Sequence, residues 1–320
     1  MMHSALSRCA RVLGIGTGGL LVLAAGTTAS AAELFRDQMT SGAGWGANAT
    51  SADAVATFNY SYAADFIPEA PNSAVGDASR RGLKLEANIG IPANPESLTL
   101  YPVGESFNGT YRLRFDMWCN YDVDEHVNGA SNATTEFMGG GIGYDNVTTD
   151  IGSGYQMIVT GDGGSGSDYR AFADGTFLAA EDMEAGSRNG FDSYYSDFLP
   201  GVAPPAGQAQ GAFPPGSAGS PGFQWVTMEF IAFDGKVHVS LEKPSGDRRK
   251  IVVFDTADYP GVGTDGNISL FYADFFTSIT PRPDLTFGII DNVVVDQVPA
   301  PGSALALGAL GCLGLRRRRR

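Results

Sequence analysis

Apolar and polar residues alternate with a period of two over several stretches of the chain. The longest such stretch, YRLRFDMWCNYDV, runs from Tyr111 to Val123. Because successive side chains of a strand point to opposite faces, this pattern predicts a half-buried β-strand. We expect Cys119 to point into the core as a small apolar residue and Trp118 to point outward from the same strand.

A second alternating region, Phe223 to Asp255, contains two turn signals. Asp234-Gly235 is typical of a hairpin turn, and Pro244 to Asp247 forms a second turn before another apolar run. Val55–Tyr62 and Arg81–Ile89 also alternate. Asn267–Asp274 and Leu285–Val298 are predicted strands as well, and the last is nearly all apolar. The pattern contains no repeat of fixed period, so it favours a sandwich or barrel over a propeller or solenoid.

The segment from Gly201 to Gly222 is rich in Pro, Gly and Ala, and it could join two domains. We favour a surface excursion within one domain, because the strands after it have too few partners to close a core alone. A body of about 265 residues is large enough for one core. The predicted fold is therefore an all-β, two-sheet antiparallel jelly-roll sandwich.

The N-terminus has the three parts of a secretory signal. Arg8 and Arg11 form a basic region, Val12–Ala25 is apolar, and Ala29-Ser30-Ala31 matches a cleavage site. We predict that residues 1–32 are a signal helix that is cleaved on export.

The C-terminus contains a short uncharged apolar run, Ser303–Leu315, followed by five arginines. A helix of this length spans roughly 20 Å, less than the ~30 Å hydrocarbon layer, so a permanent membrane span is marginal. The arginines favour a cytoplasmic location for the end of the chain and an external one for the body.

Pro299-Ala300-Pro301, the apolar run and the arginine cluster together resemble the PEP-CTERM sorting tail of bacterial exported proteins, with Ala300 where the tail usually has Glu. The resemblance covers about the last 23 residues. It implies processing by an exosortase, transient anchoring in the inner membrane, and a final location at the cell surface or in the extracellular matrix. The predicted organisation is a signal peptide (1–32), a body (33–297) and a sorting segment (298–320). The sorting residues are Pro299, Pro301, Arg316, Arg317, Arg318, Arg319 and Arg320.

The body is strongly acidic. The terminal segments hold seven of the 21 basic residues and none of the 35 acidic ones, so the body has 14 basic against 35 acidic residues, a formal charge of −21. This charge disfavours nucleic acid as a partner and suits divalent cations or polar neutral ligands. Cys9 and Cys312 lie in the terminal segments, which leaves Cys119 without a disulfide partner in the body.

Four features of the body resemble the concanavalin A-like lectin/glucanase superfamily: Leu34–Asp37 followed by Trp45, the strand Tyr111–Asn120, the hairpin Trp225–Leu241, and the closing Ile290–Val293. The resemblance implies a jelly roll of two antiparallel sheets. Members of this superfamily bind sugars, hydrolyse glucans or adhere, so the fold does not by itself specify the function.

The polar face of the long strand is the first candidate site. Sugar rings stack on indole, and Asp, Asn and Arg hydrogen-bond sugar hydroxyls. The alternative is that Trp118 packs beneath a loop and that the charges form a solvated face. The candidate carbohydrate ligands are Arg112, Arg114, Asp116, Trp118 and Asn120.

Paired carboxylates are a second candidate, since glycosidases use two acids. Asp122 and Asp124 have the right period but lack the flanking glutamates of laminarinase-type enzymes, and Asp116 with Glu136 is another pair. A third candidate is a structural calcium ion held by Asp37 and Asp291, near the first and last strands, for which the alternative is ordinary turn acids.

The sequence thus predicts an exported protein with a non-catalytic adhesive or carbohydrate-associated role in extracellular polysaccharide. A glycan hydrolase or lyase on the same scaffold is the first alternative, and a purely structural envelope protein is the second.

Overall fold

The computed structural model describes residues 31–74, 79–90, 94–123, 135–211, 218–276 and 279–298. They belong to one unit, Ala31–Ala300. Residues 1–30 of the predicted signal segment and the sorting residues Pro299, Pro301 and Arg316–Arg320 lie outside the described residues. No helix within the described ranges is long and apolar enough to cross a membrane.

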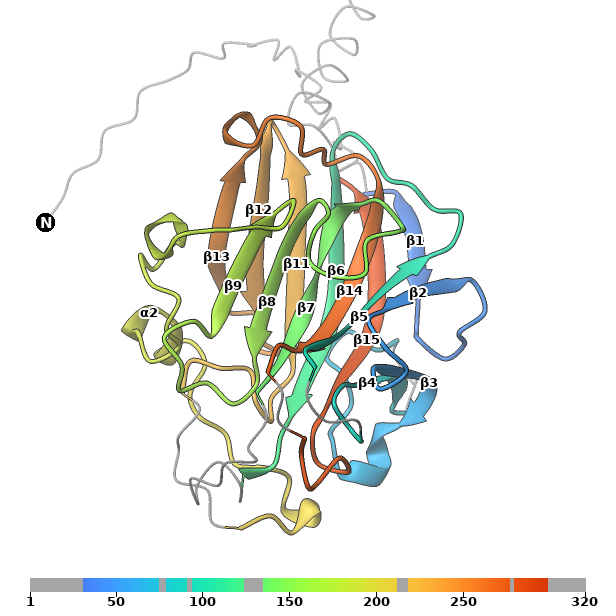
Figure 1. The fold of residues 1–320 in the computed structure, drawn as a ribbon, viewed down its shortest axis with the longest axis vertical. Helices are drawn as coiled ribbons and strands as arrows, with labels where there is room; N and C mark the ends of the chain where they lie inside the picture. The colour runs from blue at the N-terminus through green and yellow to red at the C-terminus, as the bar shows by residue number, and fades with distance from the viewer. Residues whose placement is uncertain are drawn as a thin grey trace, which may run out of the picture. The chain divides into compact units, whose positions relative to one another are not determined.

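Two antiparallel sheets form a sandwich, which confirms the predicted fold class (Figure 1). The eight-stranded sheet has the order β13-β12-β11-β6-β15-β4-β3, and β1 also pairs with β15. Its strands are β1 (Glu33–Asp37), β3 (Val55–Ser61), β4 (Arg81–Glu86), β6 (Tyr111–Asn120), β11 (Val226–Phe233), β12 (Lys236–Glu242), β13 (Arg248–Asp255) and β15 (Phe287–Gln297).

The seven-stranded sheet has the order β10-β9-β8-β7-β14-β5-β2. Its strands are β2 (Trp45–Ala49), β5 (Glu96–Pro102), β7 (Glu136–Tyr144), β8 (Tyr155–Thr160), β9 (Tyr169–Ala173), β10 (Thr176–Phe177) and β14 (Asn267–Asp274). Helical turns in the described ranges are short: η1 (Tyr62–Asp65), η2 (Ala180–Asp182), α2 (Ser193–Ser196), η3 (Ala206–Gln208) and η4 (Thr256–Asp258).

The main core lies between the two sheets and follows the alternation of β6. Leu113, Phe115 and Met117 are fully buried in it. Cys119 continues this row, and its Sγ lies 3.7 Å from the Sδ of Met138 on the opposite sheet. The predicted inward orientation of Cys119 is therefore confirmed.

Strands on either side of the Pro- and Gly-rich segment interleave in the same sheets. β11 follows that segment and pairs with β6, which precedes it, and β14 likewise pairs with β7. The strands that precede and follow residues 201–222 thus belong to the same two sheets.

Candidate functional site

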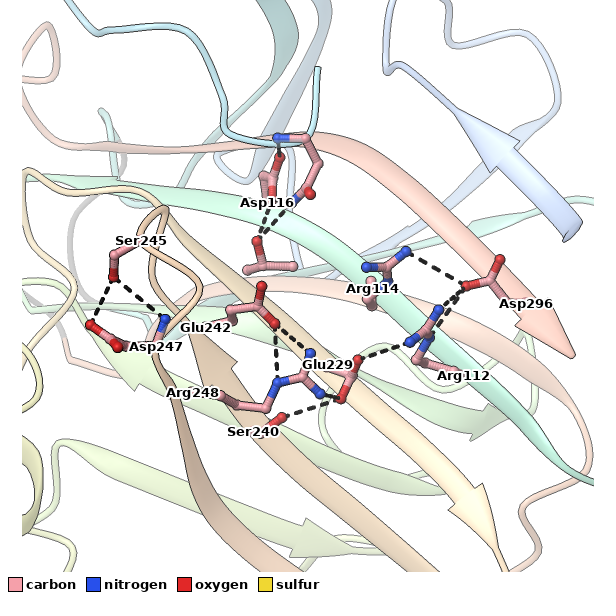
Figure 2. Close-up of polar contacts among 12 residues, drawn as sticks. Arg112, Arg114, Asp116, Glu229, Ser240, Glu242, Ser245, Asp247, Arg248 and Asp296 are labelled. Carbon is pink, nitrogen blue, oxygen red and sulfur yellow. Dashed lines mark hydrogen bonds and ion pairs between the residues drawn. The ribbon is translucent and has the colours of Figure 1, made fainter. Parts of the chain in front are cut away.

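The outer face of β6 begins with a network of ion pairs (Figure 2). Arg112 lies 2.7 Å from Asp296 and 3.6 Å from Glu229. Arg248 joins the same Glu229 to Glu242. Because these side chains neutralise one another, this part of the face has little free charge with which to attract a ligand.

Asp116 is the third outward residue of β6, after Arg112 and Arg114. It is buried and accepts four hydrogen bonds. Oδ1 accepts from Asn72 Nδ2 and from Thr227 Oγ1, each at 2.6 Å. Oδ2 accepts from the Asn72 backbone N at 3.0 Å and from Asn292 Nδ2 at 2.8 Å. Burial raises the pKa of the Asp116 carboxyl, and these hydrogen bonds partly offset that effect. Asp116 therefore organises three neighbouring polar side chains.

A β-bulge in β15 brings Asn292 to this position. Asp291 pairs with Asp116, whereas Val294 pairs with Arg114, so three steps along β15 match two along β6. The extra residue allows Asn292, at φ 54°, to face the same side as Asp291, where strict alternation would turn it into the core. Bulges commonly redirect side chains in this way at binding sites.

Trp118 lies on the predicted face but is buried, with 3% of its surface exposed. It contacts Trp225 with ring centroids 5.7 Å apart, and Trp225 in turn packs on Tyr62. Trp118 Nε1 donates to Asn120 Oδ1 at 3.3 Å, and Asn120 is also buried. Trp118 points to the outer face, as predicted, but it is not accessible, because apolar residues from the loops after β3 and before β11 cover it. The structure therefore agrees with the alternative in which Trp118 packs beneath a loop.

This covered cluster nevertheless helps to shape the open part of the face. Tyr62 OH donates to Asp291 at 3.0 Å, and Trp225 Nε1 donates to the carbonyl of Pro68 at 2.8 Å. The segment after η1 is thereby held against the sheet and delivers Asn72 to Asp116. Burial of Trp118 and binding by the neighbouring polar residues are consequently compatible.

A pocket of about 160 Å³ opens beside Asp116. Its floor contains Val294, which pairs in register with Arg36 of β1 on one side and Arg114 of β6 on the other. Since neighbouring strands are about 4.7–4.9 Å apart, the two arginines start roughly 10 Å from each other. Asn72, Thr227 and Asn292 complete the lining.

Two buried polar atoms of these lining residues have no hydrogen-bond partner among the described residues. They are Nε of Arg114, a donor, and Oδ1 of Asn292, an acceptor. Asn292 is 2% exposed, and its amide nitrogen is committed to Asp116. Unpaired buried polar atoms are costly, and a ligand that supplies partners would recover this free energy.

The structure does not bring together Asp116 and Glu136, one of the two candidate carboxylate pairs. Asp116 is on the outer face of the eight-stranded sheet, whereas Glu136 lines a small internal cavity with Cys119 and Met138. The sheet itself separates them. Asp124, the partner considered for Asp122, lies outside the described residues.

Asp37 and Asp291 also lie on opposite faces of their sheet, so the expectation that they approach each other was wrong. Asp37 pairs in register with the core residue Val293, and Asp291 pairs with the outward Asp116. Asp37 accepts from Met39 N at 2.6 Å and from Trp45 Nε1 at 2.9 Å. Across the described ranges, no group of three or more His, Cys, Asp or Glu residues could hold a metal ion.

Among the predicted ligands, only Arg114 lines the pocket, and Asp116 acts from behind the lining. Sequence reasoning missed Arg36, Asn72, Thr227 and Asn292. Arg36 and Asn292 lie within the opening and closing strands singled out from the sequence, but no local pattern connects those strands. Asn72 comes from an irregular segment, for which no periodicity exists.

The fold and the pocket define a β-sandwich with a polar site on the outer face of its eight-stranded sheet. The sequence matches no protein-family model, and no curated protein matches it.

Solved structures of similar fold include the exoplasmic/lumenal domain of VIP36 in a Ca²⁺/Man3GlcNAc-bound form (TM-score 0.41, 6% identity, 82% of this chain and 89% of that one). A second is the lectin UEA-II complexed with galactose (TM-score 0.41, 5% identity, 83% of this chain and 99% of that one). A third is the carbohydrate-binding module CBM66 from Bacillus subtilis (TM-score 0.34, 10% identity, 67% of this chain and 86% of that one). At these identities the likeness concerns the course of the chain alone.

Proposed function

We propose that the body binds carbohydrate without catalysis, through the pocket lined by Arg36, Asn72, Arg114, Thr227, Asn292 and Val294, hereafter the Arg114 pocket. The observation that carries this proposal is the combination of a small polar pocket with a buried, unpartnered Asn292 Oδ1 at its wall. Amide, guanidinium and hydroxyl groups around an apolar floor are the chemistry that orients a sugar ring.

The size of the pocket supports a small ligand unit. A volume of about 160 Å³ exceeds what a single water requires and falls below the ~300–1,000 Å³ of sites for drug-sized molecules. One sugar unit of a longer glycan fits this range, and the remaining sugar units would lie on the open part of the sheet face.

The test is a glycan array probed with the full chain and with Arg114→Gln. Arg282→Gln is the matched control, because Arg282 is an exposed arginine paired with Asp284, and it does not line the pocket. We expect glycan binding by the full chain and by the control, and loss of binding in Arg114→Gln. Absence of binding to every glycan would refute the proposal and favour a purely structural role.

The proposal includes export and processing of the tail, supported by the signal pattern of residues 1–32 and by Pro299, Pro301 and the five terminal arginines. An exosortase-type enzyme and the inner membrane are then transient partners, and extracellular polysaccharide is the lasting one. Mass spectrometry of the protein recovered from its native cell surface tests this, with a start near residue 32 and loss of the arginines expected. An intact arginine tail would contradict processing.

A further inference from the structure

We infer that the Arg114 pocket selects an acidic sugar, a uronic acid unit whose carboxylate pairs with Arg114 while its hydroxyls pair with Asn292 and Thr227. The inference rests on the proposed function and specifies its ligand class. Two observations support it: the hydrogen bonds that the lining residues donate to Asp116, and the ion pairs that Arg36 and Arg114 make within the protein.

Asp116 accepts hydrogen bonds from three residues that line the pocket, and so it fixes the orientation of their polar groups. The amide nitrogens of Asn72 and Asn292 and the hydroxyl of Thr227 all donate to its carboxylate. Each amide oxygen is therefore turned away from Asp116, and Asn292 Oδ1 has no partner among the described residues. Thr227 Oγ1 also accepts from Asn72 Nδ2 at 2.9 Å and keeps one lone pair. The lining thus contains one acceptor without a partner, Asn292 Oδ1, and a sugar hydroxyl is a donor that satisfies it.

The two arginines supply the opposite chemistry. Arg36 is already paired with Glu33 at 2.7 Å. The nearest carboxylate to Arg114 in the described part of the chain is Asp296, 3.7 Å away, and Arg112 holds the same oxygen at 2.7 Å. Arg114 consequently retains donor capacity, including its buried Nε.

The lining contains two cationic side chains and no acidic one, although acidic residues outnumber basic ones in the whole chain, 35 to 21. A guanidinium pairs a carboxylate through two parallel hydrogen bonds, which are about twice as strong as neutral ones. A neutral sugar leaves this capacity unused. A simple anion without hydroxyls leaves Asn292 Oδ1 unpaired, so a ring that carries both groups fits best.

The experiment compares uronic acid oligosaccharides with their methyl esters, which keep the skeleton and hydroxyls but remove the charge. Glucuronate, galacturonate, mannuronate and guluronate oligomers are titrated calorimetrically into the full chain, Arg114→Gln, Arg36→Gln and the control Arg282→Gln. For at least one series, we expect the acid to bind about 10- to 100-fold more tightly than the ester. Arg114→Gln should reduce acid binding to the ester level, whereas the control should bind like the parent chain.

Equal binding of acid and ester, or tighter binding of neutral glycans, that is lost in Arg114→Gln overturns the acidic ligand but preserves carbohydrate binding. Effective competition by inorganic sulfate at matched concentration would also overturn it, because sulfate brings charge without hydroxyl donors. Uronate binding that neither Arg114→Gln nor the exposed Arg36→Gln weakens refutes the site. Failure of every glycan to bind, on the array and in titration, refutes the proposed function itself.

Discussion

The side-chain amide of Asn292 donates to Oδ2 of Asp116 at 2.8 Å, from a bulge that turns Asn292 out of the alternation of β15. The two strands are already paired along their length, and this contact fixes the orientation of the Asn292 amide, with its nitrogen on Asp116 and its Oδ1 without a partner among the described residues. A carboxylate that accepts four hydrogen bonds is a structural organiser, and its own oxygens are committed. Asp116 is therefore a positioning residue.

Asp116→Ala is expected to lower the free energy of unfolding by roughly 2–4 kcal/mol, because it leaves the buried donors of Thr227 and Asn292, and the donors of Asn72, without their acceptor. Urea denaturation measures this as a lower midpoint at unchanged slope. Asp284→Ala, an exposed aspartate, should shift the free energy of unfolding by less than about 0.5 kcal/mol. Equal stability of Asp116→Ala and the parent chain would contradict the organising role.

Trp118→Ala should cost about 3–5 kcal/mol of stability, since it removes a buried indole from the cluster with Trp225. Trp118→Phe is milder and should retain glycan binding, because the indole is covered and does not line the pocket. Thermal unfolding and glycan titration of both variants test this. Loss of binding in a stably folded Trp118→Phe would restore Trp118 as a stacking residue.

Cys119 should be unreactive toward thiol reagents in the folded protein. Burial raises the pKa of its thiol, and the nearby Asp162 carboxylate adds to the effect, so the reactive thiolate is scarce. The measurement is thiol labelling of a Cys9→Ser, Cys312→Ser variant with and without denaturant. We expect labelling only after unfolding, and rapid labelling of the native variant would mean that Cys119 is accessible.

Asp274 should make the folded protein less stable as the pH rises from about 4 to about 6. Burial between the sheets raises the pKa of this carboxyl to about 6, so the folded chain holds its proton more tightly than the unfolded chain does. Stability from this group is therefore largest below its unfolded pKa and falls through the folded one, by roughly 1–3 kcal/mol.

Asp274→Asn removes the titrating carboxyl, and unfolding titrations of both proteins at pH 4, 5, 6, 7, 8 and 9 test the prediction. The slope of the parent chain should be steeper than that of the variant between pH 4 and 6, and the two should run parallel above pH 7. Asn88, which donates to Asp274 at 2.8 Å, can still bond an amide oxygen, so folding should persist. Parallel slopes throughout would place the carboxyl pKa near its ordinary value.

The alternation of a strand predicts which face each side chain occupies, but it does not predict whether a side chain on the outer face is accessible. In β6 the alternation placed Cys119 inward, and the structure agrees, because the core side of a strand depends on its own sequence. The same alternation placed Trp118 on the outer face, which is correct, but Trp118 is buried there. Whether a side chain on the outer face is covered depends on a distant loop, here the one that carries Tyr62.

The sequence by itself determined the all-β class, the inward row of β6 and the position of the hairpin at Asp234-Gly235, because each follows from local period and turn chemistry. Only the tertiary structure decided the pocket. Its lining comes from residues 36, 72, 114, 227, 292 and 294, which the strand order brings together from both ends of the chain. A bulge and a loop contact complete it, and both depend on pairing between distant strands, to which no local periodicity responds.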